Sequence, residues 1–176
     1  MTGHYLDNAA TTPVRAEAAQ AAVKAMTEEW GNPSARHALG SQAAEQVKQW
    51  RSEVAAGLGC MPEEVVFTSC GTESDNWAIR AAAELGKRKG KHIITTAIEH
   101  AAVLEPCRAL EREGYEVTYL QPDRSGNITA RQVKEALRPD TILVSMMLVN
   151  NELGSVLPVA DAVKAVRRSG APALFH

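Results

Sequence analysis

Short runs of apolar and β-branched residues alternate along this chain with segments in which apolar residues recur at helical spacing. The β-rich runs are residues 65–68, 92–96, 116–120, 142–149 and 173–176. Between them, apolar residues recur every three or four positions, as at Val103, Cys107 and Leu110. That spacing is typical of one face of a helix, whereas short β-branched runs bounded by turn residues are typical of buried strands.

Several of the predicted helices also carry start and stop signals. Ala43, Val47, Trp50, Val54 and Leu58 are spaced by 4, 3, 4 and 4 positions, and the run stops at Gly57 and Gly59. This pattern predicts one long helix that ends in glycine.

Three shorter helices are predicted in the second half of the chain. The helix that contains Val103 is expected to end at Gly114. A second contains Val133, Ala136 and Leu137 and opens at Thr129, a plausible N-cap residue. The last starts after Pro158, because proline suits the first turn, and stops at Ser169-Gly170.

Strands separated by helices of this length cannot form hairpins, so most must run parallel and be joined by right-handed crossovers. A parallel sheet has helices on both faces, and we therefore predict an α/β domain. Its ligand site should lie beyond the carboxyl ends of the strands. The segment before residue 60 has two helical patterns and no clear strand outside Tyr5-Leu6, and we expect it to pack outside the main sheet.

Composition excludes several classes of protein. The 176 residues are 45% hydrophobic and 23% charged, with a net charge of −2 and a pI near 6.2, which argues against nucleic acid or an anionic membrane as partner. No stretch approaches the roughly 20 apolar residues of a membrane span, and no secretory signal opens the chain. Cys60, Cys70 and Cys107 lie too far apart to indicate a disulfide framework or a metal site, and we interpret them as buried or neutral thiols. A cytoplasmic location fits best.

The first candidate for chemistry is the polar segment of residues 68–76, which follows the first predicted strand of the domain. Its Gly71 and Thr72 stand where a helix would start. Free backbone N–H groups, hydroxyls and the positive end of the helix dipole are what a phosphate needs. The alternative is a plain capping box formed by Thr72 and Asp75. The segment is neither a Walker A loop nor a dinucleotide fingerprint.

Two more polar clusters follow later strands. Glu99-His100 comes after the run at 92–96, and His100 could stack on a flat ligand or move a proton, or simply cap a helix. Asn150-Asn151 follows the run at 142–149 and could offer an amide to a ligand oxygen, or simply form a turn. Because parallel strands end at one edge of the sheet, we expect all three clusters to meet there.

Five motifs resemble one known family. They are Tyr5 to Pro13 (YLDNAATTP), Gly31 to Ser34 (GNPS), Phe67 to Asn76 (FTSCGTESDN), Glu99-His100, and Val149 to Glu152 (VNNE). In this order and at these spacings they are similar to the cysteine desulfurases, in particular to the type that serves nitrogenase and iron–sulfur cluster assembly. The resemblance runs over essentially the whole chain.

The resemblance implies a fold-type I enzyme dependent on pyridoxal 5'-phosphate, related to class V aminotransferases and active as a homodimer. Such enzymes take sulfur from L-cysteine, leave L-alanine and a persulfide on an enzyme cysteine, and pass the sulfur to an iron–sulfur scaffold protein. By position, Gly71 and Thr72 would hold the cofactor phosphate. His100 would stack on the ring and take part in proton transfer, as the one catalytic residue expected here, and Asn151 would hydrogen-bond an oxygen of the cofactor or substrate. No metal is expected.

The chain departs from the family pattern in what it lacks. The family's aspartate at the pyridine nitrogen, its Schiff-base lysine in a Ser/Thr-x-His-Lys run and its sulfur-accepting cysteine would all follow His176. We therefore expect an N-terminal arm at residues 1–15 and a truncated cofactor-binding large domain at residues 16–176, inactive alone. The alternatives are a non-catalytic remnant or split half that binds pyridoxal phosphate or scaffolds a partner, or another fold-type I enzyme such as a selenocysteine lyase.

Overall fold

The computed structural model describes residues 3–176, which divide into two compact units, residues 3–67 and residues 68–176. The first unit contains α1 (Ala16–Thr27), α2 (Ala38–Leu58) and a short 3-10 helix, η1 (Pro62–Glu64). The second contains α3 (Gly71–Gly86), β1 (His92–Thr96), α4 (Ala101–Arg112), β2 (Glu116–Leu120), α5 (Ala130–Ala136), β3 (Thr141–Val144), α6 (Val159–Ser169) and β4 (Leu174–Phe175).

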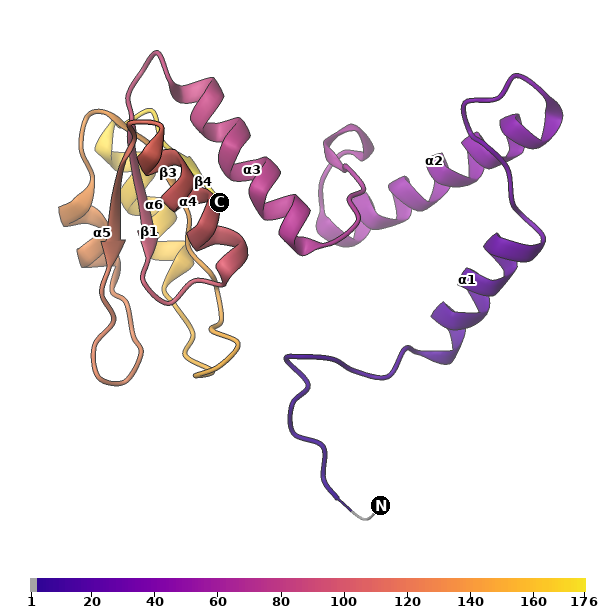
Figure 1. Ribbon diagram of the computed structural model, residues 1–176, viewed down its shortest axis with the longest axis horizontal. Coiled ribbons are helices and arrows are strands. Elements are labelled where there is room, and N and C mark those ends of the chain that lie inside the picture. Colours follow the sequence, from indigo (N-terminus) through magenta and orange to yellow (C-terminus); the bar gives the residue numbers. More distant parts are fainter. Residues whose placement is uncertain (1–2) are drawn as a thin grey trace. The chain divides into compact units, whose positions relative to one another are not determined.

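The second unit, in which Figure 1 labels β1, β3 and β4, is built on one parallel sheet with the strand order β2-β1-β3-β4. Every pairing is parallel, with Ile93 opposite Val117 on one side and Leu143 on the other. Each strand is followed or preceded by a helix, as crossover connections require. The predicted α/β class with a mostly parallel sheet is confirmed.

Helices cover both faces of this sheet. On one face Ile93 and Leu143 pack with buried residues of α3 and α4, among them Ile79 and Cys107. On the other face the neighbouring strand residues Ile94 and Val144 pack against α5 and α6, whose buried residues include Val133, Ala162 and Val166. Successive residues of a strand point to opposite faces, so the continuous apolar runs of β1 and β3 supply both cores.

A buried histidine links three strands across the sheet. The His92 ring lies between two hydroxyls, with Nδ1 2.8 Å from Thr141 Oγ1 and Nε2 2.9 Å from Thr118 Oγ1. Burial lowers the pKa of His92, and the nearby Arg138 acts in the same direction. A neutral imidazole can donate from one ring nitrogen and accept at the other, so both hydroxyls are satisfied.

The helix boundaries follow the start and stop signals in the sequence. Gly59 ends α2 at φ 70° and Gly170 ends α6 at φ 74°, a left-handed conformation that glycine adopts without a steric penalty. Thr129 caps α5 by accepting from the Gln132 N–H, while the Gln132 side chain accepts from the Thr129 N–H. The predicted ends of these helices are confirmed.

Two of the predicted strands differ from the structure. Residues 65–68 form no strand: the Val65 carbonyl accepts from the Arg51 guanidinium, and Val66 and Phe67 are exposed. A β-rich run becomes a strand only where a neighbour completes its ladder, and within the described residues none pairs with this one. The predicted strand at 142–149 is shorter, ending at Val144, because the Met147 N–H turns away from the sheet to the Glu99 carboxyl group.

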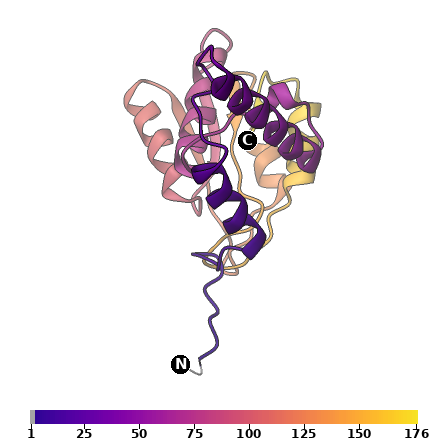
Figure 2. The ribbon, with the colours of Figure 1, turned by 90° about the vertical axis from the view of Figure 1, so that its right-hand side faces the viewer.

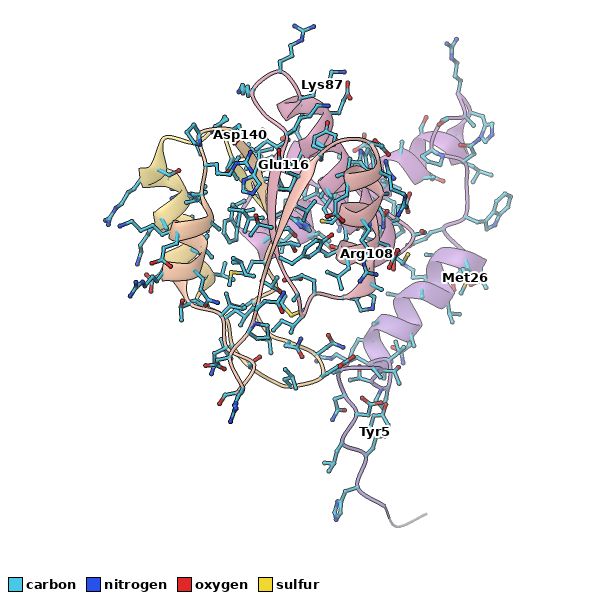
Figure 3. All side chains as sticks on the ribbon, turned by 60° about the vertical axis from the view of Figure 1, so that its left-hand side comes forward. Tyr5, Met26, Lys87, Arg108, Glu116 and Asp140 are labelled. Carbon is cyan, nitrogen blue, oxygen red and sulfur yellow. The ribbon has the colours of Figure 1, made fainter. Side chains whose placement is uncertain are left out.

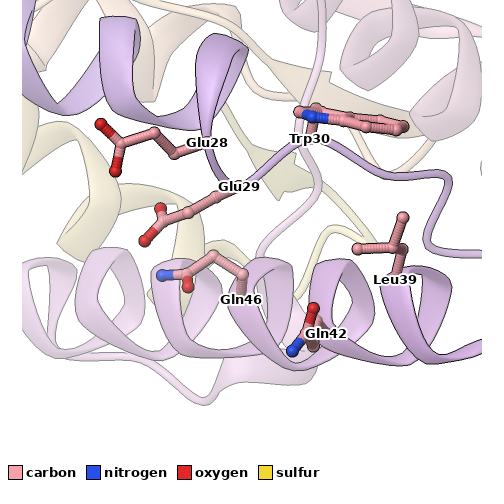
Figure 4. A pocket seen from close by; sticks show the side chains of 6 residues that line it. All are labelled: Glu28, Glu29, Trp30, Leu39, Gln42 and Gln46. Carbon is pink, nitrogen blue, oxygen red and sulfur yellow. The ribbon is translucent and has the colours of Figure 1, made fainter.

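The first unit contains the two helices predicted before residue 60, and residues 5 and 6 form no strand. Where its connecting segment meets α2, it encloses a cavity of about 380 Å³ (Figure 4). The lining residues are Glu28, Glu29, Trp30, Leu39, Gln42 and Gln46. The expectation that this segment packs outside the sheet, and the division into residues 1–15 and 16–176, stay predictions; residues 1 and 2 lie outside the described residues.

Candidate functional site

Two segments that leave neighbouring strands enclose a cavity at the carboxyl edge of the sheet. The cavity has a volume of about 450 Å³ and is lined by residues 97–101, which follow β1, and by residues 150–153, which lie beyond β3. It contains both His100 and Asn151. The expected meeting of these two residues is therefore present in the structure, and it follows from the shared edge of parallel strands.

A second, smaller cavity of about 240 Å³ lies beside the first. It is lined by Asp75, Glu99, His100, Val103, Ser145, Met146, Met147 and His176. Glu99 and His100 line both cavities, so they form the wall between them.

Glu99 holds this wall in place. Its side chain is buried, and Oε1 accepts from the Thr96 hydroxyl at 2.8 Å and from the Met147 N–H at 2.9 Å. One carboxyl group thus joins the end of β1 to the chain that leaves β3. Burial raises the pKa of Glu99, and the two hydrogen bonds partly oppose that shift.

His100 is the N-cap of α4, and its imidazole is exposed to the cavity. Nδ1 accepts from the Ala102 N–H at 3.1 Å. A ring nitrogen that accepts carries no proton, so the neutral ring holds its proton on Nε2. The capping role expected as an alternative is present, and it orients the ring and leaves Nε2 as a donor.

The two asparagines that follow β3 have different structural roles. Asn150 is buried: its amide donates to the Ile98 carbonyl at 2.9 Å, and its Oδ1 accepts from the N–H groups of Glu152 and Leu153. Asn151 is exposed, and within residues 3–176 its side chain makes no hydrogen bond. Asn150 therefore builds the turn that the alternative interpretation expected, and Asn151 presents a free amide to the cavity.

Gly71 and Thr72 lie at the exposed start of α3, as the sequence predicts. The capping box expected as an alternative, between Thr72 and Asp75, is not formed. Instead Glu73 reaches back to Ser69 and accepts from its N–H at 2.6 Å and its hydroxyl at 2.8 Å. The first helical bond runs from the Ser74 N–H to the Cys70 carbonyl, so the N–H groups of residues 71–73 have no acceptor within the helix.

The Cys70 thiol shows how these N–H groups act on negative charge. The Glu73 N–H lowers the pKa of this exposed thiol, with help from the Ser69 hydroxyl and the Thr72 N–H. Cys107 behaves in the opposite way, since burial raises its pKa to about 12. The expectation of buried or neutral thiols thus holds for Cys107, whereas Cys70 lies in an environment that favours an anion.

The second turn of α3 contacts the same edge of the sheet. The Asn76 amide donates to the Ala102 carbonyl at 3.3 Å, and Asp75 Oδ1 lies 3.6 Å from His176 Nε2. Gly71 and Thr72 stand about one turn earlier and line neither cavity. The structure therefore brings His100 and Asn151 into one cavity and places Gly71 and Thr72 on the helix that borders the neighbouring one.

The class-V aminotransferase family matches residues 4–175. The chain belongs to this family. Among curated relatives, a protein named cysteine desulfurase IscS from Acinetobacter baumannii (strain AYE) is 52% identical over 176 residues, which cover 98% of this chain and 43% of the relative. One of the same name from Methanosarcina thermophila is 47% identical over 157 residues, covering 89% and 39%.

Solved structures of similar proteins agree with the fold. A NifS-like protein superposes with a TM-score of 0.92 at 38% identity, covering 97% of this chain and 47% of its own. SspA in complex with cysteine gives 0.89 at 41% identity, covering 97% and 49%. The class-V aminotransferase chain described here spans less than half the length of these relatives.

Three residues of this class-V aminotransferase site had no assigned part in the sequence-based prediction. Ser145 directly follows β3, His176 directly follows β4, and Ser145 Oγ lies 2.9 Å from His176 Nδ1. His176 stands at the end of the predicted run 173–176, where the strand-end rule could have found it, whereas Ser145 lay within the predicted run 142–149 and could not be found in that way. Asp75 was considered only as a cap, and no sequence signal indicates its contact with His176. Within the described residues, no cluster of three or more metal-binding side chains occurs, and no helix is long and apolar enough to cross a bilayer.

Proposed function

We propose that this chain forms the first part of the pyridoxal 5'-phosphate site of a cysteine desulfurase. The enzyme would remove sulfur from L-cysteine, leaving L-alanine and an enzyme persulfide for iron–sulfur cluster assembly. The observation that carries the proposal is the shared cavity of His100 and Asn151, in a chain about half identical to proteins named cysteine desulfurase. The neighbouring cavity, which His100 also lines, includes Asp75 of α3.

The chemistry of the side chains fits the cofactor. Three N–H groups without helical acceptors and the Thr72 hydroxyl stand together at the start of α3, where they would bind a phosphate. The lowered pKa of the Cys70 thiol supports this assignment, because groups that stabilise a thiolate also stabilise a phosphate. Gly71, at the first position of the helix, has open space around it, so a ligand can approach its backbone.

His100 and Asn151 would position the ring and the substrate. The His100 imidazole, held by its bond from the Ala102 N–H, would lie against the flat ring and hold a proton on Nε2 for the substrate. The Asn151 amide would donate to an oxygen of cofactor or substrate. Pyridoxal phosphate supplies the electron sink for bond breaking at the substrate carbon.

The remaining expectations belong to the whole protein. We propose that it is a homodimer located in the cytoplasm, takes L-cysteine as substrate and passes sulfur to an iron–sulfur scaffold protein. Cysteine binding by a relative supports the substrate, since one neighbouring structure is a complex with cysteine. The 176 residues contain no His-Lys pair, the family's setting for the Schiff-base lysine. We therefore expect no sustained alanine release from this chain with L-cysteine and pyridoxal phosphate.

Binding of pyridoxal phosphate to the 176-residue chain tests the site. Equilibrium dialysis with absorbance detection should show binding that His100→Ala and Asn151→Ala each weaken by about 3- to 10-fold, the size of a lost stacking or hydrogen-bond contact. His4→Ala is the matched control, because His4 is exposed and lies in the other unit. If His100→Ala and His4→Ala bound pyridoxal phosphate with equal affinity, His100 would not be part of the cofactor site.

The product of the complete coding region tests the activity. Its visible spectrum with pyridoxal phosphate should change on addition of L-cysteine, and alanine should accumulate. A cofactor spectrum without alanine would favour a non-catalytic, cofactor-binding protein instead.

A further inference from the structure

A groove runs between α5 and α6 on the face of the sheet that these helices cover. The two helices lie side by side, orange and yellow in Figures 1 and 2. The groove has a volume of about 700 Å³ and is lined by Ala130, Arg131, Lys134, Leu137, Asp161, Lys164, Ala165, Arg168 and Ser169. None of these residues lines the cavities at His100.

The lining is strongly basic in a chain that is slightly acidic. Four of the nine residues are cations and one is a carboxylate, whereas the whole chain has 19 basic and 21 acidic residues. Arg131 pairs with Glu135 of the same helix at 2.7 Å, and Lys164 pairs with Asp161 of the same helix at 2.8 Å. The side chains of both pairs are exposed. Exposed pairs of this kind are weak, so they leave the cations available to a partner.

The other two cations of the groove have no such partner. Within residues 3–176, neither Lys134 nor Arg168 forms an ion pair or a side-chain hydrogen bond, and both are exposed. Lysine and arginine are common near helix C-termini, where the dipole favours them. That explanation covers Lys134 and Arg168, but it does not cover Arg131 and Lys164, which stand in earlier turns of their helices.

The groove also has an apolar part. Ala130, Leu137 and Ala165 are only half-buried and line the groove together with the cations. Half-buried apolar side chains beside charged groups that are mostly of one sign suit the docking of a partner with the opposite charge. The nine lining residues include no aromatic side chain on which a nucleic-acid base could stack.

We propose that the α5–α6 groove docks an acidic, amphipathic segment of a partner protein. Carboxylates of the segment would pair with the four cations, and its apolar side chains would cover Ala130, Leu137 and Ala165. The charge complementarity identifies the occupant's chemistry, and the apolar floor selects a peptide over a small anion. The proposal goes beyond the proposed enzymatic function and does not depend on the cofactor.

The test uses a fluorescein-labelled helical peptide of about 16 residues with glutamates on one face and leucines on the other, a length that spans about four helical turns. Fluorescence anisotropy with the 176-residue chain, without pyridoxal phosphate, should detect binding that weakens as salt rises. K134E/R168E should lose about tenfold or more in affinity, because like charges then face the peptide. The matched control R88E/K89E reverses two exposed cations outside the groove and should bind as the unaltered chain does.

Several outcomes would overturn the proposal. The first is an equal loss of peptide affinity in both double variants. The second is that a single-stranded oligonucleotide with the same net charge as the peptide binds more tightly than the peptide, and the third is that millimolar inorganic phosphate displaces the peptide. If circular dichroism shows that K134E/R168E is unfolded, K134Q/R168Q replaces it. Both double variants should bind pyridoxal phosphate as the unaltered chain does, so failure of the groove and failure of the cofactor site are separate results.

Discussion

Replacing Glu99 with alanine would remove the acceptor shared by two donors at the wall between the two cavities. The Thr96 hydroxyl and the Met147 N–H both donate to Glu99 Oε1, and Thr96 is fully buried. A buried donor left without a partner costs about 1–3 kcal/mol. With two donors affected, and with the cost of burying the carboxyl group removed, we expect a loss of about 2–4 kcal/mol in the free energy of unfolding.

The measurement is urea unfolding followed by circular dichroism. Glu105→Ala is the control, since Glu105 lies on α4, the helix that begins just after Glu99, pairs within residues 3–176 only with Arg108 and has a side chain 61% exposed. We expect this control to change stability by about 0.5 kcal/mol or less. A Glu99→Ala variant no less stable than Glu105→Ala would refute the role assigned to Glu99.

The pH dependence gives an independent check with Glu99→Gln, which keeps an acceptor and cannot ionise. Burial places the pKa of Glu99 in the folded chain above its ordinary value of 4.5. From pH 4.5 upward the unfolded chain releases this proton before the folded chain does, so the Glu99 contribution to stability falls until the raised pKa is passed. The stability of the unaltered chain relative to Glu99→Gln should therefore decrease with pH over that window. An increase would show that the carboxylate is stabilised in the fold rather than penalised by burial.

Two further predictions concern cysteine reactivity and a tight backbone contact. In timed alkylation at pH 7.5, followed by mass spectrometry, Cys70 should react well before Cys107. The Cys70 thiol is exposed and its pKa is lowered, whereas Cys107 is buried and has a pKa of about 12. Equal reaction rates of the two thiols would contradict this prediction. Gly90→Ala should destabilise the chain by about 1–3 kcal/mol in thermal unfolding, because a Cβ there would clash with the Asp140 carbonyl oxygen. Gly57→Ala, in open space within α2, should be neutral or slightly stabilising, and a comparable loss in both variants would contradict the steric reason.

The helices and the sheet could be predicted because their signals are local. A helix is defined by spacing and caps within one segment, as with Thr129 and Gln132 at the start of α5. The strand predicted at 65–68 was wrong because strand formation depends on a partner that is distant in sequence. At residues 146–149 the sequence shows a continuous apolar run, but the Met147 N–H donates to the Glu99 carboxyl group instead of to a neighbouring strand.

The candidate site was predictable to the extent that it follows the ends of strands. His100 and Asn151 share a cavity because β1 and β3 are neighbours that run in the same direction. The contact between Asp75 and His176 depends instead on how α3 packs over the sheet, which no local pattern encodes. The same is true of Glu99, whose partners are the last residue of β1 and a residue of the segment that follows β3.

At the opposite edge of the sheet, Arg138 donates to the carboxylates of Glu116 and Asp140, both labelled in Figure 3. These exposed bonds are individually weak, but the buried His92 ring, which lies between Thr118 of β2 and Thr141 of β3, helps to fix how far β1 is advanced along these two neighbours. A strand that slipped by two residues would keep its faces but move by about 7 Å. His100 and Asn151 would then be displaced relative to each other along the strand direction. The alignment of the proposed cofactor contacts therefore depends on polar groups at the far end of the same strands.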